Sequence, residues 1–174
     1  MKLLSWLRFE WDLRNLDFGP VELARHYSIR RAIREEEGVV RKTIQSAFLL
    51  DADWSDVLKR IWHGIDEDIS KAFDSRDAQC LVLTHGSRII GASIVSPIPT
   101  DMLHLLSGPC ILVEYRNRGF GTALLAASLR HLAAAGMDTA AGMTRKSMPA
   151  GKFVYPKFGS RFSPASPELE MASF

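Results

Sequence analysis

The sequence is poor in the features that mark disulfide-rich, membrane-spanning and metal-binding proteins. Its 174 residues include two cysteines, Cys80 and Cys110, which are too few for a disulfide framework. No apolar run approaches the ~20 residues that a membrane-spanning helix requires. Arg8 and Glu10 interrupt the apolar start too early for a signal peptide. The histidines show no metal-ligand spacing, whether at His26, His63, His85 or His131. We therefore expect a cytoplasmic protein with neither a metal nor a membrane partner.

An excess of charge of either sign is also absent. The formal net charge is +2, and the 22 basic residues are spread along the chain rather than gathered in one stretch. This distribution gives little support to a nucleic-acid-binding surface, so no nucleic-acid partner is expected. An apolar content of 47% is enough for a substantial core. We expect an accessory element over residues 1–26 and one main domain over residues 27–174.

Two familiar phosphate-binding motifs are missing from the one stretch that otherwise suits a phosphate. No Gly-Lys-Ser/Thr follows Gly121, which excludes a P-loop, and Leu124 stands where a dinucleotide fingerprint needs its last glycine. The stretch is typical of a strand ending at Ile111–Val113, a loop over Arg116–Gly121, and a helix that ends near Gly136. Unpaired N–H groups at the start of a helix, beside glycines and arginines, favour an anion. The sequence therefore predicts a phosphate-binding loop here.

Hydrophobic patterns predict strands and helices along the rest of the chain. Apolar and charged residues alternate over 7–14, which predicts a strand that we expect at a sheet edge. A short helix is expected over Pro20–His26. Further strands are expected over 26–33, 79–84, 89–95, 102–113 and 139–144 and after 158–162, and helices over 35–49, 53–73 and 147–155. Glycine and proline at 108–109 predict a bulge in the strand 102–113.

Three assignments concern side chains on these predicted helices. Asp53 is expected to cap the second helix. The consecutive acids at 66–68 are interpreted as a solvated helix face rather than a catalytic cluster. In the short helix, the apolar residues expected to face inward are Ala150, Phe153 and Val154.

The loop and its flanks resemble the GNAT family of N-acetyltransferases. The pyrophosphate loop of that family has Arg or Gln, then glycine three and five residues on, as at Arg116, Gly119 and Gly121. The predicted order of elements also matches the family over about residues 27–165. The resemblance implies an α/β (α+β) fold: a mixed, mostly antiparallel sheet of six to seven strands, with about four helices and two strands splayed at the cofactor cleft.

The resemblance also implies acetyl-CoA as a co-substrate and assigns the residues that hold it. The strand backbone at Ile111, Leu112 and Val113 would pair with the pantetheine. The loop that would hold the pyrophosphate consists of Arg116, Asn117, Arg118, Gly119, Phe120, Gly121 and Thr122.

Acyl transfer from a thioester to an amine needs a proton acceptor, a stabilised oxyanion and a proton for the leaving thiolate. The resemblance points to Tyr155 as the donor of the proton for the thiolate, because Tyr155 and Gly159 keep the spacing of tyrosine and glycine in the family. The alternative is that Tyr155 only packs in the core. Candidates for the base are His104, Glu114 and Asp101, with a chain of waters as another route. A covalent acyl intermediate on Cys110 stays open, and a backbone N–H near Ile111 would stabilise the oxyanion.

The leading hypothesis is an N-acyltransferase that passes an acetyl group directly to a small-molecule or peptide amine. A CoA-binding sensor or assembly domain without catalysis is the alternative, and a nucleotide-binding protein of another fold is a third. A homodimer is possible, and the acceptor is not encoded in any motif of the sequence.

Overall fold

The computed structural model describes residues 6–16, 18, 21–50, 58–75 and 77–165, and one seven-stranded sheet runs through it. The strands are β1 (Trp6–Asp12), β2 (Tyr27–Ile33), β3 (Asp77–His85), β4 (Arg88–Val95), β5 (Leu105–Ile111), β6 (Thr139–Arg145) and β7 (Arg161–Ala165). Their order is β2-β3-β4-β5-β6-β1-β7. All neighbours are antiparallel except β5 and β6, which run parallel. The expected mixed and mostly antiparallel sheet is confirmed.

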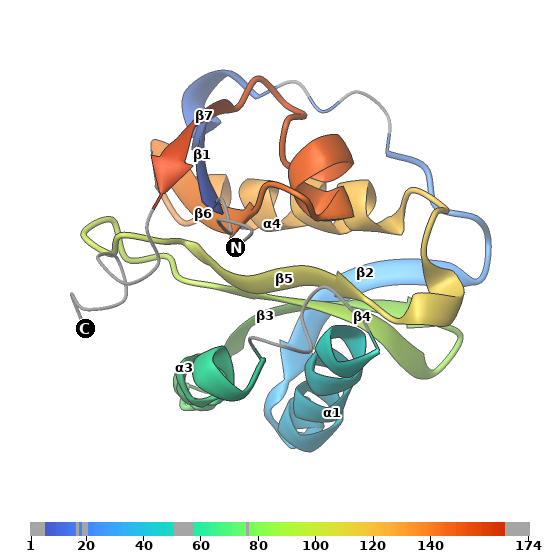
Figure 1. Cartoon of the computed structure of the whole chain (residues 1–174). Coiled ribbons are helices and arrows are strands. Elements are labelled where there is room, and N and C mark those ends of the chain that lie inside the picture. The colour runs from blue at the N-terminus through green and yellow to red at the C-terminus, as the bar shows by residue number, and fades with distance from the viewer. Residues whose placement is uncertain (1–5, 17, 19–20, 51–57, 76, 166–174) are drawn as a thin grey trace.

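Helices cover both faces of this sheet. The α-helices are α1 (Glu37–Leu49), α3 (Leu58–Phe73) and α4 (Phe120–Ala134), and the shorter turns are η1 (Leu13–Asn15), η2 (Arg34–Glu36), η3 (Val113–Tyr115) and the π-helical η4 (Ala150–Val154). Figure 1 shows α1 and α3 below the sheet and α4 above it. The strands β3 and β4 are buried along most of their length, because a helix layer lies on each side of them. No helix within the described ranges is long and apolar enough to cross a membrane.

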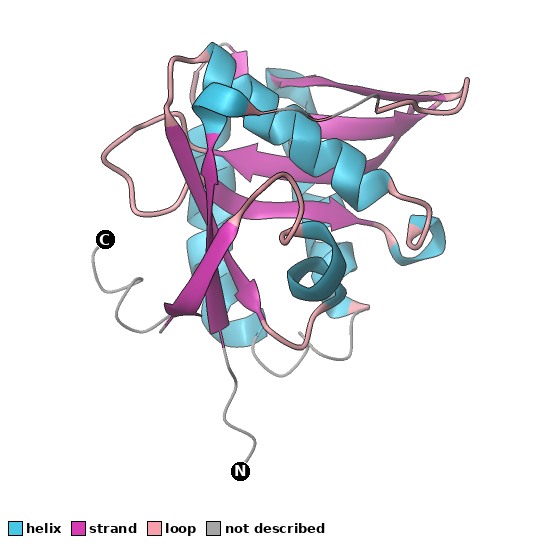
Figure 2. Ribbon diagram, turned by 90° about the horizontal axis from the view of Figure 1, so that it is seen from above, coloured by secondary structure: helices cyan, strands magenta, loops and turns pink. Residues whose placement is uncertain are grey.

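The strand β1 occupies an inner position in the sheet. Its residues alternate as predicted, with Phe9 and Trp11 buried and Glu10 and Asp12 exposed. It pairs with β6 on one side and β7 on the other, so the expectation of an edge strand is wrong. Alternation identifies a buried face, but it carries no information about which strands lie beside it. Figure 2 shows the three strands β6, β1 and β7 turned steeply away from the other four.

Two local expectations fail, and one lies outside the described residues. Residues 21–24 have no regular structure, so the helix predicted over Pro20–His26 is absent from its described part. In η4 the side chain of Phe153 is 67% exposed rather than inward. This short segment is a single π-turn, whose wider repeat turns Phe153 away from the core. The proposed cap at Asp53 falls among residues 51–57, which are not described.

Gly91 in β4 lets β5 approach closely at the point where β5 enters the functional region. A Cβ atom at this position would lie 2.8 Å from Ile111 Cδ1 and 2.9 Å from the backbone oxygen of Cys110. We predict that Gly91→Ala lowers the free energy of unfolding by ~1–3 kcal/mol, since the backbone of β5 must shift.

Gly38→Ala is the matched control, because a Cβ atom there meets nothing within 4 Å and Gly38 lies in α1. Alanine should leave stability unchanged or raise it by up to ~1 kcal/mol, as expected in a helix. Urea unfolding of both variants measures the difference. Equal stability of Gly91→Ala and the wild type would contradict the close packing of β4 against β5.

Candidate active site

The two parallel strands β5 and β6 separate directly after they meet. They pair at Leu105 and Gly142 alone. Beyond that point β5 is bent at Gly108, which has a φ of 126° and precedes a cis peptide bond to Pro109. The register of β5 against β4 shifts in the same region, so the predicted bulge is confirmed. Since proline has no N–H to donate, the strand cannot continue a regular ladder there. The separated strands leave a cleft.

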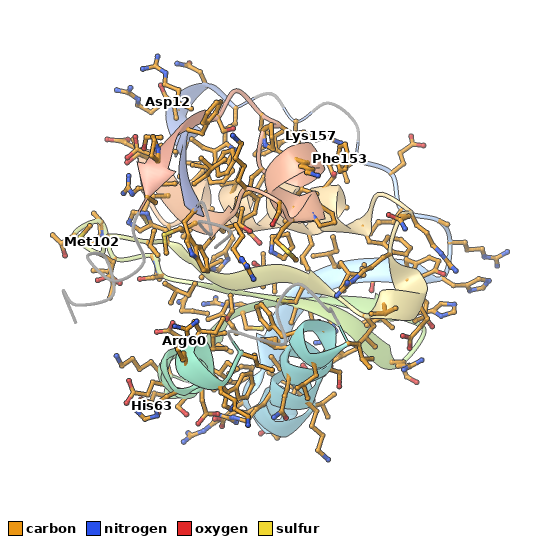
Figure 3. All side chains as sticks on the ribbon, in the orientation of Figure 1. Asp12, Arg60, His63, Met102, Phe153 and Lys157 are labelled. Atoms are coloured by element: carbon orange, nitrogen blue, oxygen red, sulfur yellow. The ribbon has the colours of Figure 1, made fainter. Side chains whose placement is uncertain are left out.

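This cleft is a cavity of about 870 Å³. One end lies at the N-terminus of α4, the middle runs along β5, and the other end lies against α1 and α3. Figure 3 shows Phe153 and Lys157 on the α4 side of β5, and Arg60 and His63 on α3 on the opposite side. All four line the cavity. A second cavity, of about 650 Å³, shares Gly119, Phe120, Thr122 and Lys157 with the first.

The predicted anion loop lies at the first end of the cleft. Gly119 caps α4 with a left-handed φ of 81°, and Asn117 before it is also left-handed, with a φ of 63°. Ala123 donates the first backbone hydrogen bond of α4, to Gly119 O at 3.1 Å. The N–H groups of residues 120–122 precede that bond and lie at the positive end of the helix dipole. These residues line the cavity, so the backbone geometry suits an anionic group.

The side chain of Arg116 is a clamp between backbone segments. Its Nε donates to Ile111 O at 3.0 Å and its Nη2 donates to Ala47 O at 2.8 Å. The guanidinium thereby ties the loop to the end of β5 and to the last turns of α1. Arg116 also lines the cleft, so its contact with a phosphate stays a prediction, although two of its nitrogens already donate to carbonyl oxygens.

Lys157 supplies a cation that the sequence analysis missed. Its Nζ donates to Thr122 Oγ1 at 3.2 Å, in the first turn of α4. The position of its backbone is fixed because Trp11 Nε1 donates to Lys157 O at 3.0 Å. Lys157 is 35 residues from Thr122 in the chain, so no local pattern pointed to it.

Arg118 lines the second cavity and lies over the Tyr115 ring.

The strand backbone offers one N–H group to the cleft. Leu112 donates to Ile90 O in β4 at 2.9 Å. Because hydrogen bonds alternate sides along an antiparallel strand, the N–H of Ile111 faces away from β4, toward the separated β6. Ile111 lines the cavity, whereas Leu112 is buried and Val113 is 43% exposed in η3; neither of these two lines it.

Tyr155 lines the cleft with its hydroxyl at the bend of β5. The hydroxyl donates to Gly108 O at 2.6 Å, and the ring packs edge-on against Phe9 and Trp11, with centroids 5.4 Å away in both cases. Burial raises the pKa of Tyr155, so the phenol keeps its proton at neutral pH. The phenol is therefore a hydrogen-bond donor placed beside the bulge.

His104 lies at the junction of β5 and β6, just before β5 begins. Its backbone N–H donates to Ala141 O at 2.8 Å, and Ala141 N–H donates to His104 Nδ1 at 3.0 Å. Burial lowers the pKa of His104, which favours the neutral ring that this contact requires. His104 is 5% exposed and is not among the residues that line the cleft. Its contacts hold together the two strands that separate next to it.

Of the remaining candidate groups, Cys110 lines the cleft, whereas Asp101 and Glu114 lie outside it. Burial raises the pKa of Cys110 to about 12, so its thiol is protonated and poorly nucleophilic. Asp101 accepts a hydrogen bond from the Ser96 hydroxyl, and Glu114 is paired with Arg88 at 3.1 Å. Neither carboxylate lines the cleft. Within the described part of the chain, no group of three or more potential ligands gathers to hold a metal ion.

Two carboxylates of α3 line the cleft, Glu67 and Asp68, and Asp68 is the more buried of the two. Asp66 is paired with Arg41 at 2.6 Å and lies outside the cavity, and Glu67 is exposed. Asp68 lines the cavity and is half-buried. Burial raises its pKa to about 6, Lys71 opposes that shift, and Glu67 and Asp101 add to it. The predicted solvated face thus holds for Glu67 but not for Asp68.

Comparison with known proteins assigns the chain to a family. A model described as the Acetyltransferase (GNAT) family matches residues 43–159, which is more than half of the chain. The chain belongs to the GNAT acetyltransferase family. The resemblance drawn from the sequence is confirmed. A search of curated proteins found no match.

Solved structures share this GNAT fold at low sequence identity. A GCN5-related N-acetyltransferase from Sphaerobacter thermophilus covers 92% of the chain, with a TM-score of 0.63 and 13% identity, over 49% of its own length. A GNAT-family acetyltransferase from Colwellia psychrerythraea covers 93%, with a TM-score of 0.61 and 13% identity, over 53% of its length. A Drosophila protein covers 92%, with a TM-score of 0.60 and 12% identity, over 48% of its length. The chain spans about half the length of these structures, and at such identities the matches show the fold.

The clamp at Arg116 yields a prediction for the GNAT loop. Arg116→Lys should lower the free energy of unfolding of the ligand-free protein by ~1.5–3 kcal/mol, because one lysine nitrogen would replace the two fixed guanidinium nitrogens that donate to Ile111 O and Ala47 O. Arg118→Lys is the matched control two residues on, since the Arg118 side chain is exposed. Thermal and urea unfolding without ligand compare the two. An Arg116→Lys variant with weakened ligand binding but unchanged stability would show that the guanidinium acts on the ligand instead.

Proposed function

We propose that this chain is an acyl-CoA-dependent N-acetyltransferase that transfers the acetyl group of acetyl-CoA to a primary amine by direct attack in a ternary complex. The observation that carries the proposal is the continuity of the 870 Å³ cleft. It connects an anion-binding helix terminus, a bent strand with an inward N–H and a half-buried carboxylate on α3. Acetyl-CoA is a substrate in this reaction and not a resident group.

The residues along the cleft fit an acyl-CoA molecule. The N–H groups of residues 120–122 and the ammonium of Lys157 suit the pyrophosphate. The edge of β5 that faces away from β4 suits the amide groups of pantetheine, and Ile111 N–H suits the carbonyl oxygen of the thioester. The second cavity, on the other side of the same loop, provides room for the nucleoside part.

Tyr155 is assigned the role of general acid. As the C–S bond breaks, the phenol would release its bond to Gly108 O and pass its proton to the thiolate. His104 is assigned no direct part in this scheme, because it holds the junction of β5 and β6 and does not line the cleft.

A CoA-binding domain without catalysis is the second candidate. The observation that favours it is the engagement of Tyr155 with Gly108 O, since a tyrosine held there for packing alone would leave no acid beside the thioester. Single-turnover transfer from radiolabelled acetyl-CoA separates the two. Polyamines, amino acids, aminoglycosides and peptides with a free N-terminus or lysine form the panel. Labelled product from any amine supports the transferase, and CoA binding without product supports the sensor.

The helix terminus gives a direct test of CoA placement. We predict that Gly121→Asp raises the dissociation constant of CoA by at least ~tenfold, because a carboxylate would repel the pyrophosphate. Gly121→Ala is the matched control, since a Cβ atom there meets only Val154 Cγ2 at 3.6 Å. Both variants should fold normally, as checked by circular dichroism. Isothermal titration provides the affinities, and an unchanged affinity of Gly121→Asp would move CoA away from this loop.

The acid role of Tyr155 gives a second test. Tyr155→Phe should lower kcat by ~100-fold or more while the dissociation constant of CoA stays within a few-fold of the wild type. The phenyl ring keeps its packing against Phe9 and Trp11, so the fold should survive. Steady-state rates and CoA titration measure the two effects. A variant with wild-type kcat would leave Tyr155 as a packing residue.

A further inference from the structure

We propose that Asp68 binds the ammonium group of the acceptor and accepts its proton, which makes it the general base of the reaction. The inference rests on the proposed N-acetyltransferase function and adds the class of acceptor: a cationic primary amine carried on an apolar group.

The position of Asp68 on α3 is unusual for a charged residue. Ile61, Gly64, Ile65 and Asp68 follow one another at intervals of three, one and three residues, which places them on one face of the helix. All four line the cleft. Elsewhere this helix buries apolar residues, among them Ile69 and Phe73. On either side of this stripe, α3 also presents Arg60, His63, Glu67 and Lys71 to the cleft. A half-buried carboxylate beside apolar residues is costly unless a cation completes it.

In the described part of the chain, the cation whose field acts on Asp68 is Lys71, which lies three residues on and lines the same cleft but makes no salt bridge with the carboxylate. No hydrogen bond or salt bridge there involves the Asp68 carboxylate, whereas Asp66 is paired with Arg41 and Glu67 with His63. The charged groups whose fields act on Asp68 are Lys71 and Glu67 on α3 and Asp101 in the loop before β5. Lys71 has the largest of these charge effects and the two acids oppose it, so the charge of Asp68 is only partly offset within the protein.

A second polar group in the cleft also lacks a partner. Ser107 in β5 lines the cleft and is 4% exposed, and its hydroxyl has no hydrogen-bond partner among the described residues. It directly precedes Gly108, whose oxygen accepts the bond from Tyr155. A buried and unsatisfied hydroxyl costs stability until a ligand pairs with it. Unpaired polar groups thus lie on β5 beside the bulge and on α3, as a polar acceptor would require.

The proton balance of the step is complete. The ammonium of the acceptor gives one proton to a carboxylate oxygen of Asp68, and the freed nitrogen lone pair forms a bond to the thioester carbon. The C–S bond breaks, and the sulfur takes the proton of the Tyr155 phenol. The nitrogen then loses its second proton, which restores the phenol. Asp68 returns its proton to solvent, so the reaction releases amide, CoA thiol and one proton.

The expected pH dependence follows from the ionised form of Asp68. Its pKa of about 6 means that the carboxylate is largely ionised at pH 7 and is protonated below pH 6. The value of kcat/KM should therefore rise with pH through about 6 in the wild type. Asp68→Asn should lower kcat/KM ~100-fold and abolish its rise with pH. Asp68→Glu, which keeps a carboxylate, should have a higher kcat/KM than Asp68→Asn and should show part of that rise.

Asp66→Asn is the matched control, because it makes the same change of charge on the same helix outside the cleft. Its pH profile should equal that of the wild type. CoA affinity should be unchanged in all three variants, which shows that each one folds. Asp68→Asn with the wild-type profile would overturn the inference while leaving the transferase intact. A wild type that acetylates no amine of the panel would instead overturn the proposed function.

A binding measurement tests Asp68 even without turnover. Hexylammonium has the cation and the apolar chain that the stripe on α3 predicts, and hexanol is its uncharged counterpart. Titrated into the CoA-loaded protein by NMR, hexylammonium should bind the wild type at least ~tenfold more tightly than Asp68→Asn, and hexanol should bind both equally. Equal affinity of hexylammonium for the two proteins would exclude Asp68 as the ammonium site.

Discussion

The separation of β5 from β6 is the constraint on which the site depends. Parallel neighbours usually satisfy each other's backbone groups along their whole length, but these two strands pair only at Leu105 and Gly142. On the closed side, His104 exchanges two hydrogen bonds with Ala141. On the open side, the hydroxyl of Tyr155 holds the bulge through Gly108 O. One edge of β5 is thereby left to a ligand, within a sheet that otherwise pairs its strands.

Different contacts stabilise the paired part and the separated part of β5 and β6. Gly142 allows Leu105 to come close, since a Cβ atom there would lie 3.1 Å from the Leu105 side chain. The open part instead relies on long-range contacts: Arg116 joins the loop to α1, and Trp11 fixes the backbone of Lys157. The β1 strand contributes Phe9 and Trp11 to the wall behind Tyr155. The N-terminal strand thus belongs to the structure that positions the site.

The sequence predicted the parts of this structure that rest on local chemistry. The glycine loop, the bulge at Gly108 and the strands β3 and β4 each follow from residues within a few positions of one another. Contacts that join distant segments could not be predicted from local patterns. The carbonyl oxygen of Ala47 that accepts a hydrogen bond from Arg116 lies 69 residues away in the chain. The neighbours of β1 were missed for the same reason. Asp68 was missed differently, since its place three residues after Ile65 on the apolar stripe was visible in the sequence but was treated as part of an acidic run.

The two ends of the cleft differ in charge: the α4 end has the helix N-terminus and Lys157, whereas the α3 end is mixed, with Glu67 and Asp68 beside Arg60 and Lys71. The start of α4 and Lys157 attract negative charge, and Asp68 attracts positive charge. An ammonium at the α4 end would meet the helix dipole and a lysine, and a pyrophosphate at the α3 end would meet a carboxylate; both arrangements are repulsive. In the proposed function, acetyl-CoA would therefore enter with its pyrophosphate at the α4 end, and the acceptor amine would approach the thioester beside Ile111 and Tyr155 from the side of α3. Burial strengthens this selection, because fields inside a protein are screened less than in water.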